Sequence, residues 1–401
     1  MPHNSWLAHG LQTGAITLAH PFRSFFLLTG AYGTVTVIAW MSILFGGVSL
    51  PLGWSPLYWH SHEMLFGLIP TAITGFLLTA MCNWTGATPL RGKGLFLLIT
   101  IWLAGRVVMW TANWWPVAIV AAIDMLFLPV TAIYMTRVLL QHGNKRNLPI
   151  AAILLLLSLA NLMMHIGFIT GDSHWLQRGE LMALGLITLM MIVIGGRIIP
   201  LFTANWLRNQ TNHVDTVKSF VVLDRAAIIA TILLIPLDFF INIPWLTGAL
   251  ALIAGILNAL RLMGWSGWRT VREPLLWILH LGYGWIIVAL LLKSAAAFNL
   301  AAPTAWQHAL GVGAMGTLIL GVMTRVALGH TGRPLSLPKF AITIYIAITM
   351  AAFARVLAAL QLLDYRIGLL VAATTWSLAF GIFVLIYWPI LTRPRADGRS
   401  G

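Results

Sequence analysis

The sequence contains few charged residues and very few acidic ones. Only 8% of its 401 residues are Asp, Glu, Lys or Arg, and 10 residues are acidic. A soluble domain carries about 25% charged residues. The chain is instead 59% hydrophobic, and its mean hydropathy is +0.88. These values exclude an ordinary soluble protein and predict an all-α, polytopic integral membrane protein.

Cysteine is nearly absent as well. The chain has one cysteine, Cys82, so it cannot form a disulfide within itself. It also lacks the Cys-x-x-Cys-His motif that attaches a c-type haem.

Long apolar stretches are abundant. A helix needs about 20 apolar residues to cross a bilayer. Twelve stretches approach or exceed this length, at residues 24–46, 60–82, 94–112, 116–138, 149–170, 179–200, 220–240, 243–262, 274–296, 304–328, 339–360 and 367–390. We predict a single transmembrane domain of about twelve helices over residues 23–391. An N-terminal segment, residues 1–22, precedes it, and a basic tail, residues 392–401, follows it.

Basic residues alternate between the predicted loops. Every second loop and the tail contain them, at Arg91, Lys93, Arg137, Lys145, Arg146, Arg208, Lys218, Arg261, Arg269, Arg272, Arg333, Lys339, Arg393, Arg395 and Arg399. Loops rich in Lys and Arg are cytoplasmic by the positive-inside rule, which predicts that both termini are cytoplasmic. Topology thus explains the net charge of +14. We expect the lipid bilayer, and no nucleic acid, as a partner.

Several histidines fall at membrane depth. An ionisable side chain there is costly and marks a functional site by default, and imidazole ligates haem iron and copper. His62 is near the start of the second stretch and His308 near the start of the tenth, both on the predicted outer side. We predict that they are the axial ligands of a haem b. A hydrogen bond to a neighbouring helix is the alternative for any single buried histidine.

The other membrane histidines are assigned by depth. His60 points away from His62 on its helix, so we assign it, with His165 of the fifth stretch, to copper. His20, His280 and His330 fall nearer the cytoplasmic side. They are further candidates for metal binding or a proton path, and interfacial anchoring is the alternative for the first and the last.

Three acidic residues, Glu63, Glu180 and Asp124, also lie in or beside apolar stretches. Carboxylates there can orient a histidine or relay protons. The alternative is an ion pair with Arg106 or Arg178.

Two arginines lie near the inner ends of the sixth and tenth stretches, Arg197 and Arg325. A guanidinium matches the geometry of a carboxylate, so these residues could hold haem propionates. Contacts with lipid headgroups are the alternative.

Four segments together resemble the NnrS family: HPFRSFFLLTGAYG, WHSHEMLFGLIPTAITGFLLTA, GGRIIPLFTANW and GVMTRVALGHTGR. The resemblance implies a twelve-helix protein of the bacterial inner membrane that contains haem and copper. It also implies a role in the response to nitric oxide and in the relief of nitrosative stress, with nitric oxide or a nitrosylated species as the ligand.

A fainter resemblance is to the catalytic subunit of haem–copper oxidases. HEMLFGLIPTAITGFLLTAMCNW is similar to their second helix and HALGVGAMGTLI to their tenth. This implies a similar helix bundle and a haem-ligand role for His62 and His308. However, Trp306 stands where the oxidases have a further histidine, and their His-Pro-Glu-Val copper motif is absent. A complete oxygen-reducing site is therefore not expected.

Three classes of function remain open. The first is a haem- and copper-binding protein that binds nitric oxide or repairs nitrosative damage. The second is a nitric oxide reductase or oxidase that takes electrons from quinol or another donor. The third is a secondary transporter, although such transporters are commonly built from internal repeats and no repeat is visible here. The sequence assigns no catalytic residue.

Overall fold

The computed structural model describes residues 13–210, 217–240 and 243–399. This part of the chain is helical and contains no strand. Most of the predicted N-terminal segment, residues 1–22, lies outside the described residues, as do the last two residues of the predicted tail.

Eleven helical segments among the described residues are long and apolar enough to cross a membrane. They match eleven of the twelve predicted stretches, so the chain is a multi-pass α-helical membrane protein. The seventh stretch also forms a helix, α10 (Val221–Phe240), but this helix carries three charged residues, Asp224, Arg225 and Asp238. Because of these charges, α10 is not among the eleven segments that are apolar enough to count as candidate membrane spans.

The chain forms two compact units. Unit 1 comprises residues 1–180, 323–335 and 380–401, and unit 2 comprises residues 181–322 and 336–379. The single transmembrane domain over residues 23–391 stays a prediction.

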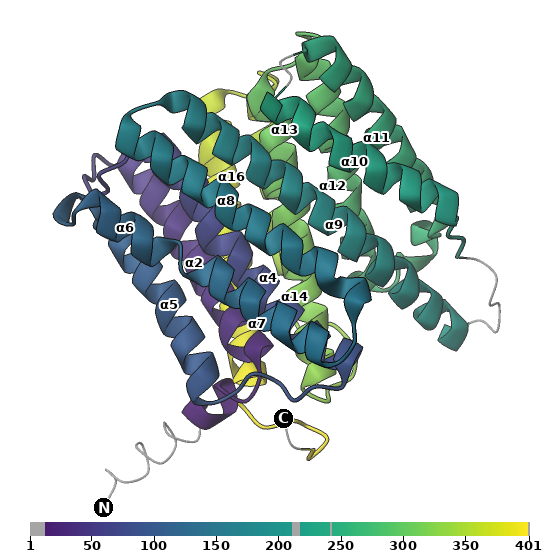
Figure 1. Cartoon of the computed structure of the whole chain (residues 1–401). Helices are drawn as coiled ribbons and strands as arrows, with labels where there is room; N and C mark the ends of the chain where they lie inside the picture. Colours follow the sequence, from purple (N-terminus) through teal and green to yellow (C-terminus); the bar gives the residue numbers. More distant parts are fainter. Residues whose placement is uncertain (1–12, 211–216, 241–242, 400–401) are drawn as a thin grey trace, which may run out of the picture. The chain divides into compact units, whose positions relative to one another are not determined.

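Unit 1 is built mainly from the first half of the chain (Figure 1). Its helices are α2 (Pro21–Phe45), α3 (Pro56–His62), the π-helix η1 (Glu63–Leu68), α4 (Ile69–Thr85), α5 (Lys93–Trp110), η2 (Ala112–Trp114), α6 (Val117–Asp124), α7 (Phe127–Gln141), η3 (Lys145–Asn147), α8 (Leu148–Thr170) and the start of α9 (Ser173–Gln210). Helix α2 packs on α4, α4 on α7, and α7 on α8.

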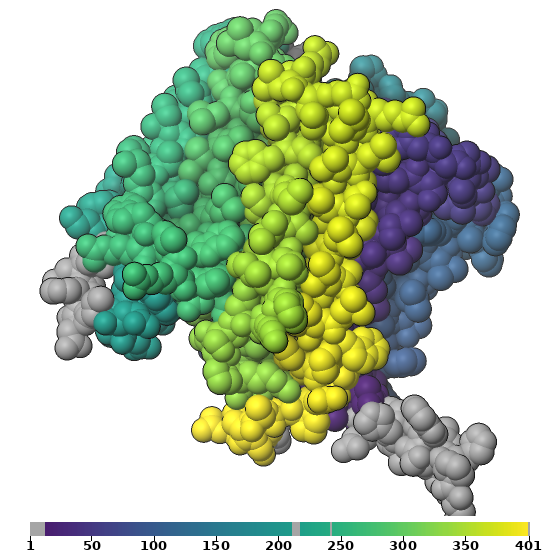
Figure 2. Space-filling view, turned by 180° about the vertical axis from the view of Figure 1, so that it is seen from behind, coloured from purple at the N-terminus to yellow at the C-terminus, as the bar shows by residue number. Residues whose placement is uncertain are grey.

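Glycines let α2 approach its neighbours closely. A Cβ on Gly33 would lie 2.8 Å from the ring of Phe380, in the last part of α16 (Tyr365–Leu391). A Cβ on Gly75 of α4 would lie 2.8 Å from Cβ of Phe25. Figure 2 shows the end of α16, in yellow, beside α2, in purple. The buried Arg23 of α2 also donates to the carbonyl oxygens of Leu391 and Arg393, both at 2.9 Å.

Two spans of unit 1 depart from regular α-helix. The second span begins as α3, continues through the π-helix η1 directly after His62, and ends as α4. The fourth span is interrupted at Met125 and Leu126, between α6 and α7. Single π-turns inside α-helices are frequent at functional sites. Both irregularities lie next to ionisable residues, His62 and Asp124.

Unit 2 contains the remaining helices. They are α9 from residue 181 onward, α10, α11 (Pro244–Gly264), η4 (Gly267–Thr270), α12 (Pro274–Ala297), α13 (Pro303–His308), the π-helix η5 (Ala309–Gly316), the start of α14 (Thr317–His330), α15 (Ile342–Ala359) and most of α16. Helix α11 packs on α10 and α12, and η5 packs on α12 and α15.

The glycine pair that opens the GGRIIP segment has a packing role. A Cβ on Gly195 would lie 3.2 Å from the Tyr283 ring, and one on Gly196 would clash with a guanidinium nitrogen of Arg261. Arg261 also donates to Oδ1 of Asp224 at 2.7 Å and to the Tyr283 hydroxyl at 2.6 Å. The two glycines therefore let a charged network pack against α9.

Candidate metal centre

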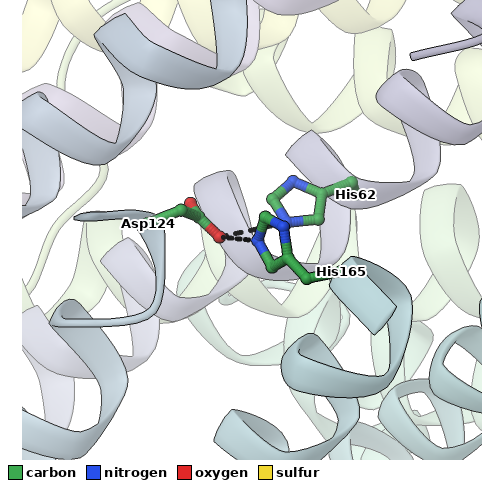
Figure 3. Close-up of side chains that lie close together, drawn as sticks. All are labelled: His62, Asp124 and His165. Atoms are coloured by element: carbon green, nitrogen blue, oxygen red, sulfur yellow. Dashed lines mark hydrogen bonds and ion pairs between the residues drawn. The ribbon is translucent and has the colours of Figure 1, made fainter. Parts of the chain in front are cut away.

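Three side chains with metal-binding atoms meet inside unit 1: His62, Asp124 and His165 (Figure 3). Their ligand atoms all lie within 4.8 Å of one another. Oδ2 of Asp124 is 2.9 Å from Nε2 of His165 and 3.2 Å from Nε2 of His62. All three residues are at least 97% buried. We call these three residues the His–Asp–His cluster.

Each member comes from a different helix. His62 is the last residue of α3, and Asp124 is the last residue of α6, where the fourth span is interrupted. His165 lies in α8, one turn after Asn161. Residues four apart share a face of a helix, so α8 presents an amide and an imidazole to the same place.

A layer of polar side chains surrounds the cluster. Nδ1 of His62 is 3.0 Å from Oε1 of Glu63, which also accepts a 2.6 Å hydrogen bond from Arg106. Arg106 donates as well to Oδ1 of Asp124. The guanidinium therefore joins the two carboxylates, which confirms the ion pair with Arg106 that the sequence suggested as an alternative.

Asn161 and Tyr32 complete this layer. The Asn161 amide donates to Oδ2 of Asp124 at 2.8 Å, and its carbonyl oxygen lies 2.9 Å from Nε2 of His62. The Tyr32 hydroxyl donates to Glu63, and it accepts a 2.8 Å hydrogen bond from Trp110. Each oxygen of the two carboxylates therefore has at least one partner.

Both ring nitrogens of His62 face oxygen atoms that accept hydrogen bonds. Nδ1 faces Glu63, and Nε2 faces Asp124 and Asn161. A neutral imidazole has one N–H and can satisfy only one of these sides. The other side must carry a second proton or a metal ion. A carboxylate on the outer nitrogen of a metal-bound histidine is a common arrangement, so Glu63 suits metal binding through Nε2.

The charges of the surrounding residues also indicate that the site needs a further positive charge. Glu63 and Asp124 bring two negative charges and Arg106 brings one positive charge, and all three side chains are buried. With neutral histidines, one negative charge remains. Burying an uncompensated charge is strongly unfavourable, so the site favours one further positive charge, either a second proton on His62 or a bound cation.

The two separations measured from Asp124 are compatible with a metal ion as well as with hydrogen bonds. Two ligands about 2.1 Å from a metal, at angles of about 90–110°, lie about 3.0–3.4 Å apart. The separations of 2.9 Å and 3.2 Å from Oδ2 of Asp124 are close to this range. Two imidazoles and one carboxylate suit copper, iron or zinc.

A family comparison identifies the chain. The model of the family described as NnrS protein matches residues 16–395. The chain belongs to the NnrS family. This confirms the resemblance found in the sequence, and it supports a family role in the response to nitric oxide. No curated protein matches the chain.

Aromatic rings of this NnrS-family chain enclose the cluster. The Trp54 ring lies 5.1 Å from the His62 ring and 5.4 Å from the His165 ring, measured between centroids. Phe168 stacks on Trp54, with ring centroids 4.6 Å apart. Trp54 and Tyr32 were not predicted as site residues. The only signal for them was that Tyr32 belongs to the family segment HPFRSFFLLTGAYG.

The structure gives His60 and His308 other surroundings. The His60 ring stacks on Trp40, with centroids 4.6 Å apart. His308 belongs to unit 2, where Nδ1 lies 2.7 Å from the carbonyl oxygen of Thr304. The axial haem pair His62 and His308 and the shared copper of His60 and His165 stay predictions.

The three glycines after His308 differ in which side chains lie next to them. A Cβ on Gly313 would lie 2.6 Å from Trp285, and one on Gly316 would lie 2.5 Å from Trp376. A Cβ on Gly311 would meet no described atom within 4 Å. Of the three, Gly311 alone leaves room for another group beside the backbone.

The remaining predicted residues lie apart from the cluster's contacts. His280 is buried in α12, and its Nε2 lies 2.9 Å from Oγ1 of Thr203. Glu180 is half-buried in α9, Arg197 is exposed in the same helix, and Arg325 is buried in α14. Their proposed roles as proton-path or propionate residues stay predictions.

His20 and His330 flank one ring at the end of unit 1. The Phe22 centroid lies 5.9 Å from the His20 ring and 5.5 Å from the His330 ring. Arg395 donates to the carbonyl oxygen of His330 at 2.9 Å. The two histidines therefore lie in a basic, aromatic environment.

We expect His20 to make the stability of the protein depend on pH. Burial, then the charge of Arg23 and that of His330, lower the pKa of His20 to about 4 from an ordinary value of 6.5. Between these values the unfolded chain binds a proton that the folded chain does not, so stability falls as pH falls. The His20→Gln variant should show a smaller drop in melting temperature from pH 7 to pH 5. An unchanged drop, equal to that of the exposed control His142→Gln, would contradict this.

Proposed function

We propose that this protein binds copper and haem in the bacterial inner membrane and acts in the response to nitric oxide and the relief of nitrosative stress. Membership of the NnrS family supports the role in the nitric oxide response. The His62 imidazole, whose two nitrogens both face acceptor oxygens, is the observation that carries the proposal of a metal.

We assign the copper to His62, Asp124 and His165. Two imidazoles and a carboxylate are ligands that copper accepts. Nε2 of His165 is the nitrogen that would bind, because it lies 2.9 Å from Oδ2 of Asp124; its Nδ1 atom has no hydrogen-bond partner among the described residues. His60 stacks on Trp40, and it is therefore a weaker candidate than His62 for a ligand shared with His165.

The proposed haem ligand is His308. It ends an α-helix immediately before a π-helix, as His62 does, and its Nδ1 is anchored on the carbonyl oxygen of Thr304. A backbone partner on Nδ1 directs a histidine to bind a metal through Nε2. His62 can give its Nε2 to one metal only, so the copper and haem assignments of His62 compete, and the contacts of Asp124 and Asn161 favour copper.

A bound copper ion would supply a coordination position for nitric oxide and a one-electron redox couple. The chain's own residues would prepare this place. Glu63 and Arg106 fix the orientation of His62 and Asp124. Asn161 holds Oδ2 of Asp124, the oxygen that faces both imidazoles, and the Trp54 ring covers the two imidazoles. The proposal does not require catalytic turnover.

Metal content and optical spectra of purified variants test these assignments. We expect His62→Ala and His165→Ala to lose copper and keep the Soret band of haem, and His308→Ala to lose the Soret band and keep copper. His142→Ala, which changes an exposed histidine near the end of α7, is the control. Loss of haem in both His62→Ala and His308→Ala would instead support the axial pair. Wild-type copper in both His62→Ala and His165→Ala would contradict the copper site.

A further inference from the structure

Four segments of unit 1 that are far apart in the sequence meet where α2 begins. They are residues 18–23, 91–93, 330–333 and 391–399. The N–H of Gly92 donates to the carbonyl oxygen of Leu18, and the N–H of Ala396 donates to that of Thr331, both at 2.9 Å. The side chain of Arg23 joins the first segment to the fourth, and Figure 1 shows the C-terminal tail at the same end of unit 1 as the start of α2. We call this junction the basic end.

The basic end contains seven Lys and Arg residues and one acidic residue. The acidic residue, Asp397, lies 2.5 Å from a guanidinium nitrogen of Arg395 and 4.0 Å from one of Arg399. The other basic residues have no carboxylate partner in the described part of the chain, and they are Arg23, Arg91, Lys93, Arg333 and Arg393. Like charges held close together repel, so the folded chain leaves an excess of positive charge at this place.

The excess charge acts on a partly buried histidine. Burial lowers the pKa of His20 to about 4, and the charges of four basic residues contribute to this shift. These residues are Arg23, His330, Arg395 and Arg91. The buried Nδ1 atom of His20 has no hydrogen-bond partner among the described residues. The segments therefore concentrate positive charge around one point, which an anion can compensate.

Apolar side chains adjoin the basic end on two membrane helices. Helix α5 exposes Phe96 and Leu97 in the turn after Lys93. Helix α16 exposes Leu385 and Trp388 in its last two turns. Both helices are long and apolar enough to span a membrane, so we expect these side chains to meet lipid tails. A ligand with an anionic head and apolar tails fits both the charge and its apolar surroundings.

We propose that the basic end binds the phosphate headgroup of an anionic phospholipid, whose acyl chains lie along α5 and α16. A guanidinium pairs well with phosphate, and Arg91 and Arg393 are exposed and can reach a headgroup at the membrane surface. A zwitterionic lipid carries an ammonium group, which the excess positive charge repels. The headgroup would supply the negative charge that the four segments lack.

Native mass spectrometry of the delipidated full chain in detergent tests the proposal, with phosphatidylglycerol and phosphatidylethanolamine as the probes. We expect tighter binding of phosphatidylglycerol. Each basic residue near anionic lipid contributes about fivefold in affinity, so Arg91→Gln and Arg393→Gln should each lose about fivefold. The triple variant Arg91→Gln/Arg333→Gln/Arg393→Gln should lose about a hundredfold.

A variant expected to gain affinity guards against misfolding. Asp397→Asn removes the one carboxylate of the basic end, so it should bind phosphatidylglycerol about fivefold more tightly than the wild type. A misfolded site would lose affinity instead. Binding of this variant that is no tighter than that of the wild type would overturn the proposal.

The matched control removes three other positive charges from unit 1. Arg137→Gln/Lys145→Gln/Arg146→Gln changes exposed residues at and after the end of α7, and it should bind phosphatidylglycerol as the wild type does. Equal losses in the two triple variants, or equal wild-type affinity for the two lipids, would overturn the proposal. Displacement of the lipid by inorganic phosphate at the same concentration would identify a site for free phosphate and would overturn it too.

Discussion

Replacing Arg106 with leucine is expected to destabilise the protein by about 3–5 kcal/mol, the range found when one partner of a buried ion pair is removed. The guanidinium donates to both Glu63 and Asp124, and all three side chains are buried. Leucine would leave two carboxylates without a counter-charge. Thermal unfolding of the detergent-purified protein, followed by size-exclusion chromatography, measures the loss.

Arg137→Leu is the matched control, because Arg137 is exposed on α7. Substitutions at exposed positions usually change stability by less than about 0.5 kcal/mol. The double variant Arg106→Leu/Glu63→Gln removes one of the two unpaired charges and should recover part of the loss. If the Arg106 and Arg137 variants melted at the same temperature, the central role of this guanidinium would be refuted.

Removal of copper is expected to lower stability by about 2.7 kcal/mol, relative to protein in free copper at a hundred times its dissociation constant. The reason is that folding alone brings together ligands from α3, α6 and α8, so the ion binds the folded chain. Melting temperatures with copper and with a chelator give the difference.

The His165→Ala variant should show almost no change in melting temperature when copper is removed. His280→Ala, which alters a buried histidine of unit 2, should respond to copper as the wild type does. An equal response in both variants would show that copper stabilises the chain from another place.

The membrane helices were largely predictable because each depends on local composition. Eleven predicted stretches are helices long and apolar enough to span a membrane, and the seventh is a helix with three charges. The break at Met125 and Leu126 was not predicted, since the surrounding sequence, AAIDMLFLPV, is apolar apart from Asp124. The signal for it is Pro129, in the first turn of α7, which has no N–H to donate to the carbonyl oxygen of Met125.

The sequence identified members of the metal centre but not their grouping. His62, His165, Asp124 and Glu63 were singled out because ionisable residues are rare at membrane depth. Their association depends on how each helix is rotated, and a π-helix shifts the faces of the span that follows it. If the helical periodicity is counted through η1 as though it were regular α-helix, the residues after His62 are assigned to the wrong face of the span.

The ion pairs of Arg106 also bear on how the chain enters the membrane. Glu63, Arg106 and Asp124 belong to three consecutive spans. Inserting a span with one central arginine or aspartate costs about 2.5–3.5 kcal/mol per charge. Because Glu63 precedes Arg106 in the chain, the span with the arginine can be neutralised as soon as it leaves the translocon, and the next span brings the second carboxylate to a partner already in place. The order of the charges along the sequence thus suits co-translational assembly, with α8 and His165 added last.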